Sequence, residues 1–303
     1  MSKLFYFKDL DSHYVIYLFG VRFCLKHKCN FKYKEADVFG INNAEFRNPK
    51  LIVSLTSYPA RISTVHITIN TLLNQSLKPD KLLLWLAKEQ FPNAEKDLPE
   101  ELLKLKNLGL EIEWCDKDLK SYKKLIPALI KYPNDIIVTA DDDVYYQPDM
   151  LESLYNAYLN NPNNIYVKRS VKLRMSNGYL EGISPRKYMY KHLTEPSYFN
   201  QLMGGSGCLY PPNSLYKDCI NIDLIRNTIP THDDAYFWSM AVLNRTKIQV
   251  IGGFDEDLYF VDGTQDVGLI HTNQKGQEGI ALEDAYKVMI SKYPNILSIL
   301  KEQ

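Results

Sequence analysis

The sequence has no excess of charge of either sign. Its 303 residues include 36 lysines and arginines and 36 aspartates and glutamates, so the formal net charge at neutral pH is +0. Proteins that hold nucleic acid through its phosphates need a strong positive field. The balance of charge therefore argues against bulk nucleic-acid binding, and we expect no nucleic-acid partner.

Long hydrophobic runs and a secretory signal are also missing. The longest early apolar run, Tyr14 to Cys24, is interrupted by Gly20 and Arg22 and is too short to span a bilayer. No apolar core followed by a small-residue cleavage site opens the chain. The five cysteines, an odd number without regular spacing, suit a reducing compartment. We therefore expect a cytoplasmic protein.

Residues 1–48 form a distinct opening segment, and we predict one main domain over residues 49–303. Phe5–Phe7 and Tyr14–Phe19 are aromatic and apolar. Four lysines follow closely, namely Lys26, Lys28, Lys32 and Lys34. A hairpin packed on the main domain is one interpretation. The other is peripheral contact with an anionic membrane surface, because aromatic and lysine side chains suit such an interface.

Apolar strands alternate with amphipathic helices through the first half of the main domain. The expected strands cover 51–56, 81–87 and 110–114 and a run that begins at Asp135, and the helices cover 63–77, 98–108, 123–131 and 148–158. Such alternation predicts a parallel sheet covered by helices on both faces. The second half is less regular. We expect a strand at 165–167, loops or an antiparallel excursion over 170–200, a glycine-rich approach to a strand from 204, a helix from 231, and strands at 247–251 and 267–272.

Three consecutive carboxylates, Asp141-Asp142-Asp143, follow the strand that begins at Asp135. In an open α/β sheet, ligands bind at the carboxyl ends of the strands. Adjacent carboxylates repel one another unless a cation or hydrogen-bond donors lie among them. Asp141 and Asp143 are two residues apart, so an extended backbone would place both on one side and Asp142 elsewhere. A solvated acidic turn that caps the helix near Pro148 is the alternative.

Carboxylate oxygens suit Mn²⁺ or Mg²⁺, and two of them leave coordination positions open for a diphosphate. At this point the sequence resembles the DxD-containing GT-A glycosyltransferases, in particular the bacterial enzymes of lipopolysaccharide and capsule biosynthesis. Other features follow in the order found in that family. These are Thr56–Arg61, similar to the nucleoside-binding loop; Lys120–Leu129, similar to the segment before the DxD element; Gly204–Gly207, similar to the acceptor-side glycines; His232-Asp233-Asp234, similar to the acidic pair; and His271, similar to the C-terminal metal ligand.

The resemblance implies a Rossmann-like α/β fold, the GT-A fold, with a mixed, mainly parallel sheet flanked by helices. It implies a nucleotide-sugar donor such as a UDP-sugar, a glycan or glycolipid acceptor, and Mn²⁺ or Mg²⁺ as cofactor. The residues that match the family's motifs then take three expected roles. The nucleotide is bound by Thr56, Ser57, Arg61, Lys124, Asp141 and Asp142; the metal by Asp141, Asp143 and His271; and the acceptor proton is taken by Asp234 or Asp233, with inversion at the anomeric carbon.

Other interpretations of these residues stay open at this point. Thr231 and Asp234 have the spacing of a helix-capping pair, and His271 suits a strand end equally well. A metal-dependent nucleotidyltransferase would also combine carboxylates, a divalent ion and a diphosphate. That class carries a glycine-rich signature after its first strand, and Thr56–Arg61 contains no glycine. A non-catalytic sugar-binding protein of the same fold is the third alternative.

Overall fold

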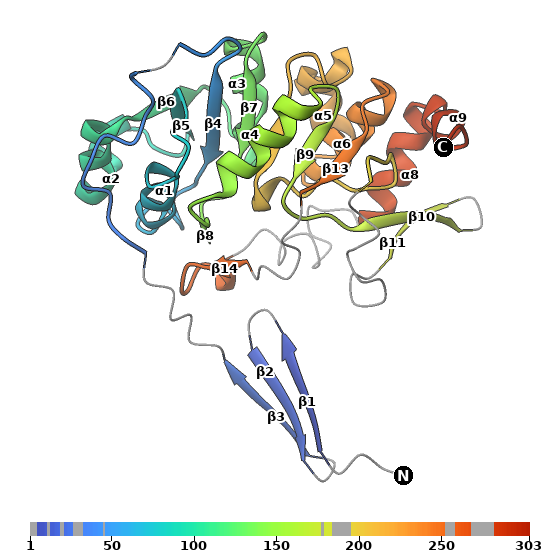
Figure 1. Cartoon of the computed structure of the whole chain (residues 1–303), viewed down its shortest axis with the longest axis horizontal. Helices are drawn as coiled ribbons and strands as arrows, with labels where there is room; N and C mark the ends of the chain where they lie inside the picture. The colour runs from blue at the N-terminus through green and yellow to red at the C-terminus, as the bar shows by residue number, and fades with distance from the viewer. Residues whose placement is uncertain are drawn as a thin grey trace.

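The computed structural model describes residues 5–10, 13–18, 21–26, 33–44, 46–176, 179–183, 195–251, 258–267 and 282–303. A seven-stranded sheet forms the centre of the main domain (Figure 1). Its strand order is β13-β9-β12-β7-β4-β5-β6. The strands are β4 (Leu51–Thr56), β5 (Lys81–Ala87), β6 (Leu110–Cys115), β7 (Ile136–Thr139), β9 (Ile165–Val167), β12 (Cys208–Tyr210) and β13 (Ile248–Val250).

All neighbouring strands of this sheet are parallel except β12, which runs antiparallel to both β7 and β9. β4 lies between β5 and β7, and its residues are buried up to Leu55. A strand buried on both faces has to be apolar along its whole length, which is why these segments read as continuous hydrophobic runs. The predicted mixed, mainly parallel sheet flanked by helices is confirmed.

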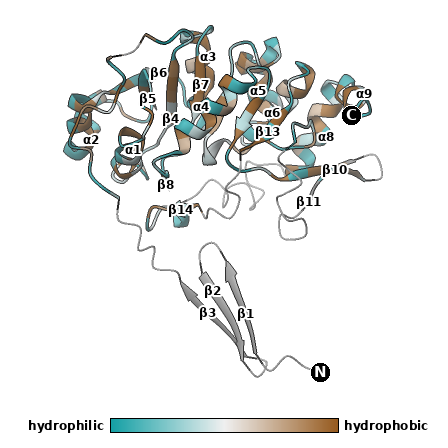
Figure 2. Ribbon diagram, viewed as in Figure 1, coloured by the Kyte–Doolittle hydropathy of each residue, from teal (hydrophilic) through white to brown (hydrophobic). Residues whose placement is uncertain are grey.

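Helices cover both faces of the sheet, and each face has its own hydrophobic core. Ile52 and Leu83 point into the core that includes residues of α3 (Ile126–Lys131), α5 (Ile222–Thr228), α6 (Asp233–Leu243), α8 (Leu282–Lys292) and α9 (Asn295–Leu300). Val53 and Leu84 point into the other, with α1 (Val65–Leu73), α2 (Glu100–Lys104) and α4 (Met150–Asn160). Successive strand residues face opposite sides, so each strand contributes to both cores. Figure 2 shows the sheet as a hydrophobic layer between helices whose exposed sides are hydrophilic.

Several predicted helices are shorter than expected or change type. The 98–108 segment divides into α2 and a 3₁₀ turn, η2 (Leu105–Leu108), and ends at Gly109 with φ 110°, as its proposed C-cap role requires. The 123–131 segment begins as the 3₁₀ turn η3 (Lys120–Lys124) and continues as α3, with Pro127 in its first turn. Helix α1 begins at Val65 because the chain before it turns back at Arg61, whose carbonyl accepts from the amide of Thr64.

Beyond its strands in the central sheet, the second half contributes to two separate two-stranded antiparallel sheets. β10 (Lys172–Ser176) and β11 (Tyr179–Ile183) pair as the expected antiparallel excursion. β8 (Val144–Tyr145) pairs with β14 (Tyr259–Phe260), which brings residues 258–267 beside the acidic turn. Of the strand expected at 267–272, only Val267 is described, at the end of the 3₁₀ turn η7 (Gln265–Val267), and the remainder lies outside the described residues.

The opening segment contains β1 (Phe5–Leu10), β2 (His13–Leu18) and β3 (Val21–Lys26), which form a separate antiparallel sheet (Figure 1). The division of the chain at residue 48 stays a prediction. Within the described ranges, every helix is too short or too polar to cross a membrane.

Candidate functional site

The acidic turn lies at the C-terminal end of β7, next to the loop that follows β4. These two strands are parallel neighbours, so the chain segments leaving them meet at one edge of the sheet. Ser57 Oγ donates to Asp142 Oδ2 over 2.6 Å, and Arg61 Nη1 lies 2.8 Å from Asp142 Oδ1. The structure thus brings Ser57, Arg61 and Asp142 together.

Asp143 shares the same guanidinium group. Arg61 Nη1 lies 3.0 Å from Asp143 Oδ2, and Gln265 Nε2 donates to that oxygen over 2.7 Å. The expectation that Asp141 and Asp143 would lie on one side, with Asp142 elsewhere, is therefore not met, because Asp142 and Asp143 share Arg61 while Asp141 contacts Lys124. The reason is local: Asp142 and Asp143 lie in a turn, and side chains alternate between two sides only in an extended backbone.

The acidic turn holds more negative charge than its surroundings neutralise. Burial, followed by the charge of Asp141, raises the pKa of Asp143 to about 7, although Arg61 opposes the shift. Burial also raises the pKa of Asp142, again against the effect of Arg61. Asp141 keeps 39% of its side chain exposed, so it forms the open side of the turn.

Lys124 connects the acidic turn to helix α6. Its Nζ lies 2.9 Å from Asp141 Oδ1 and 3.0 Å from Asp233 Oδ2. Burial alone would lower the pKa of Lys124, but these carboxylates raise it well above the usual value, so the amine stays charged. Its backbone is fixed because Ser54 Oγ donates to the Lys124 carbonyl over 2.6 Å and itself accepts from Trp85 Nε1.

Asp233 and Asp234 lie in the first turn of α6 and have different surroundings. Asp233 Oδ1 accepts from Ser121 Oγ over 2.8 Å, and Oδ2 lies 3.0 Å from Lys124 Nζ in an ion pair without a hydrogen bond. Asp234 Oδ1 accepts from the amide of Gly204 over 2.9 Å. Burial, followed by the charge of Asp233, raises the pKa of Asp234 to about 7. Its carboxylate is therefore poised to take up a proton near neutral pH.

The helix-capping interpretation of Asp234 is wrong. Helix α6 begins at Asp233 and its N-cap residue is His232, which makes no side-chain capping hydrogen bond. The helix start therefore lies one residue later than a Thr231 cap would place it. The carboxylate of Asp234 is bound instead by the glycine-rich loop, which comes from a distant part of the chain.

Gly204 and Gly205 allow this loop to approach the acidic turn closely. A Cβ atom on Gly205 would lie 2.0 Å from Asp141 Oδ2, so only glycine fits there without a shift. The buried Tyr146 fixes the approach. Its hydroxyl accepts from the Asp141 amide over 2.8 Å and donates to the Gly205 carbonyl over 2.5 Å.

Some site residues have no recognisable signal in the sequence. Tyr146, Gln265 and Ser121 are ordinary polar residues whose importance comes only from the partners that folding gives them. Thr56, a predicted nucleotide contact, donates its hydroxyl to the carbonyl of Trp85 over 2.8 Å. His271, the third predicted metal ligand, lies outside the described residues.

The charge of the site suits a divalent cation. Two cationic side chains face five carboxylates, those of Asp141, Asp142, Asp143, Asp233 and Asp234. Asp141 and Asp143 supply the hard oxygen ligands that Mn²⁺ and Mg²⁺ prefer. Within the described part of the chain, no group of three or more His, Cys, Asp or Glu side chains has the arrangement of a complete metal site. Among the described residues, Asp141 and Asp143 are therefore at most part of a site for such an ion.

No protein-family model and no curated protein matches this chain. Among solved structures, the mannosyltransferase PcManGT from Pyrobaculum calidifontis, in complex with GDP-Man and Mn²⁺, is 12% identical, with a TM-score of 0.48 over 90% of this chain and 78% of that one. TarS 1–349 from S. aureus, in complex with UDP-GlcNAc, is 16% identical, with a TM-score of 0.47 over 84% and 71%.

The 4-diphosphocytidyl-2C-methyl-D-erythritol synthase from Anaerococcus prevotii is 15% identical, with a TM-score of 0.47 over 72% of this chain and 95% of that one. At these sequence identities and TM-scores, the likeness concerns the overall fold alone. The function has to be inferred from the side chains of the site.

Proposed function

We propose that this protein is a metal-dependent glycosyltransferase. It would move a hexosyl or N-acetylhexosaminyl group from a nucleotide-diphosphate donor, a UDP-sugar, to a hydroxyl of a growing cell-surface glycan such as lipopolysaccharide. One observation supports this above all: at one edge of the sheet, the acidic turn and two cationic side chains meet a second carboxylate pair. A cation site beside a proton acceptor is what transfer from a diphosphate requires.

The donor would bind across the ends of β4 and β7. Ser57 and Arg61 would contact the nucleoside together with Thr56, and Asp141 or Asp142 would lie near the ribose. Asp141 and Asp143 would hold the divalent ion, with His271 as a proposed third ligand. When bound, the ion would supply positive charge that neutralises the diphosphate. Lys124, already charged and buried beside Asp141, would stabilise the negative charge of the departing diphosphate.

Asp234 is the stronger candidate for the general base. Asp233 is paired with the charge of Lys124 at 3.0 Å and accepts a hydrogen bond from Ser121, whereas the Gly204 amide is the one hydrogen-bond partner of Asp234 among the described residues. A pKa of about 7 also suits a base that works near neutral pH. We therefore assign proton transfer to Asp234 and the positioning of Lys124 to Asp233.

In the proposed reaction, the acceptor oxygen attacks the anomeric carbon while its proton moves to Asp234. The bond from that carbon to the diphosphate breaks in the same displacement, through a transition state with oxocarbenium-ion character. A base opposite the leaving group gives a single displacement. The product is therefore expected to have the inverted anomeric configuration.

The deciding experiment is incubation with a panel of nucleotide sugars and Mn²⁺, followed by measurement of free nucleoside diphosphate. One donor should be hydrolysed slowly without an acceptor, and EDTA should stop the release. Release of pyrophosphate from a nucleoside triphosphate and a sugar phosphate would instead identify a nucleotidyltransferase. Donor binding without any release would identify a non-catalytic sugar-binding protein.

The place of action is part of the same proposal. We infer that residues 49–303 form the transferase domain and that the protein works in the cytoplasm. Residues 1–48, rich in aromatic residues and lysine, would contact the inner face of the membrane, where a glycolipid acceptor is accessible.

A further inference from the structure

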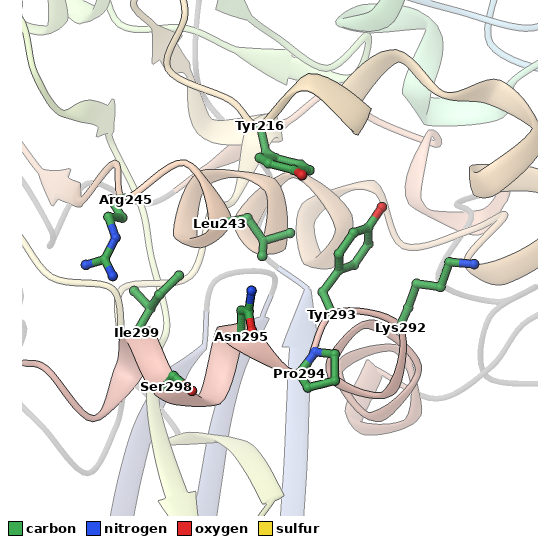
Figure 3. Close-up of a pocket in the computed structure, with 9 residues that line it drawn as sticks. All are labelled: Tyr216, Leu243, Arg245, Lys292, Tyr293, Pro294, Asn295, Ser298 and Ile299. Atoms are coloured by element: carbon green, nitrogen blue, oxygen red, sulfur yellow. The ribbon is translucent and has the colours of Figure 1, made fainter.

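A pocket lies at the far end of helix α6 from the acidic site. Its volume is about 400 Å³, and it is bordered by Tyr216, by the residues that end α6, and by the junction of α8 and α9 (Figure 3). Helix α6 has 11 residues, and at 1.5 Å per residue it separates Asp234 from this pocket by roughly 15 Å. The pocket is therefore distinct from the site described above.

Two tyrosine rings form part of the apolar surface of this pocket, together with Leu243, Pro294 and Ile299. The rings of Tyr216 and Tyr293 meet edge to face, with centroids 6.2 Å apart and an interplanar angle of 75°. The hydroxyl of Tyr293 donates to Asp218 Oδ2 over 2.6 Å, which fixes the orientation of its ring. Rigid aromatic faces with polar groups beside them suit a ring that has both apolar and hydroxylated surfaces.

The charged side chains of the pocket are cationic. Figure 3 shows Arg245 and Lys292 on opposite sides, with the tyrosine rings and Asn295 between them. Among the described residues that line the pocket, none carries a carboxylate. Arg245 binds Glu302 through both Nη1 and Nη2, the latter 2.9 Å from Oε1, and both side chains are half exposed. Water screens an exposed ion pair, so a bound anion can compete with Glu302 for the guanidinium.

The backbone at Arg245 is unusual for an arginine. Its φ of 59° lies in the left-handed region, where glycine or asparagine normally ends a helix. The amide of Arg245 donates to the carbonyl of Val242, so the residue closes α6 while its guanidinium lines the pocket. The presence of a bulky cation at a strained position is consistent with a use for its side chain.

We propose that this pocket binds an anionic saccharide residue, one that carries a carboxylate or a phosphate group. A pyranose ring would pack against Tyr216 and Tyr293, its hydroxyls would bond to Asn295 and Ser298, and its anionic group would contact one of the two cations at the edges of the pocket. The volume is at the lower end of the range found for small-molecule sites and suits one or two sugar rings. That this saccharide belongs to the acceptor glycan rests on the proposed function; the binding itself does not.

Saturation-transfer NMR on the full chain tests the proposal, with glucuronic acid, glucose 1-phosphate and glucose as probes. At least one anionic probe should bind, and glucose should bind at least about tenfold more weakly. The double variant Arg245→Gln/Lys292→Gln should bind the anionic probe about tenfold or more weakly than the wild type does. The matched control is Lys287→Gln, which removes a charge from α8 outside the pocket and should change nothing.

Equal binding of glucose and both anionic probes, or unchanged binding in the double variant, would overturn the proposal. Comparing the two anionic probes identifies whether carboxylate or phosphate is preferred. Donor hydrolysis, measured on the same samples, should be the same in the wild type and the double variant. Absence of hydrolysis in the wild type would refute the proposed transferase while leaving the saccharide site intact.

Discussion

The carboxylate of Asp234 has the environment of a proton acceptor. It is partly buried at the start of α6, beside the charge of Asp233, and receives one amide hydrogen bond from Gly204. The start of a helix favours the ionised form, and burial and a neighbouring negative charge oppose it. Because the opposing effects prevail, the pKa rises to about 7.

The pH dependence of transfer follows from that value. The base acts only when ionised, so the turnover rate should rise about tenfold per unit from pH 5 to 6 and level off above about 7. Turnover at saturating donor and acceptor, measured from pH 5 to 9, checks this. A rate that stays flat below pH 7, with donor binding intact, would exclude Asp234 as the base.

Replacing Asp234 by Asn should separate activity from stability. Transfer should fall by at least about 10²-fold, because the base is lost. Between pH 4 and 7 the folded wild type binds a proton that the unfolded chain releases, so its stability falls as the pH rises through that window. Asn has no such titration. The melting temperature of the variant minus that of the wild type should therefore be larger at pH 8 than at pH 5.

Calorimetry at the two pH values measures that gain. The control is Asp223→Asn, an exposed residue in the first turn of α5 with no role in the site. It should leave both activity and the pH dependence of melting unchanged. An Asp234→Asn variant that melts with the wild-type pH dependence would contradict the electrostatic description of this carboxylate.

At the scale of elements, the site depends on a segment that joins it from far along the chain. β14 pairs with β8, and the amide of Val261 donates to the carbonyl of Asp143 over 2.8 Å. The carbonyl of Thr264 accepts from Arg61 Nη2, and Gln265 binds the carboxylate of Asp143. The acidic turn is therefore held from both sides, by the loop after β4 and by residues 258–267.

The glycine-rich loop gives a graded test of this packing. A Cβ on Gly205 would meet Asp141 Oδ2 at 2.0 Å, whereas a Cβ on Gly204 would lie no closer than 3.2 Å to Lys124. Gly205→Ala should therefore displace Asp141 and weaken binding of Mn²⁺ with UDP by about tenfold or more. Gly204→Ala is the matched control and should weaken it much less. Isothermal titration measures both, and equal effects would contradict the close approach of the loop.

At the scale of the whole molecule, ligand binding should appear as added stability. A ligand present at 100 times its dissociation constant stabilises the folded state by about 2.7 kcal/mol. We expect UDP with Mn²⁺ to raise the melting temperature and EDTA to cancel the rise, because the diphosphate needs the cation in a site rich in carboxylates.

The Asp143→Ala variant should lose both that response and at least about 10²-fold in transfer, while circular dichroism shows that it stays folded. If the Asp143→Ala variant keeps its activity and the same dependence on Mn²⁺, the metal-site hypothesis is refuted. Lys287→Gln, whose charge lies on the exposed side of α8, serves as the control that should respond as the wild type does.

The sequence predicted the sheet well because its strands are buried on both faces. β4 and β5 begin and end at the residues expected from their apolar runs. The helices were less well defined, because a helix in contact with a core can end early or tighten into a 3₁₀ turn, as at Leu105. α8 and α9 were not predicted, since their apolar faces match partners that only folding supplies, such as Trp238 against Tyr286.

The sequence by itself determined the alternating fold and the position of the acidic turn at the end of a buried strand, because both depend on local patterns of apolar and charged residues. The tertiary structure alone decided which partners those carboxylates have. It placed Lys124 between Asp141 and Asp233, gave Asp142 and Asp143 a shared guanidinium, and directed the Gly204 amide at Asp234. The contacts of the site join residues up to 203 positions apart, as between Arg61 and the Thr264 carbonyl. No local pattern specifies them, because they arise only when the sheet brings the ends of its strands together.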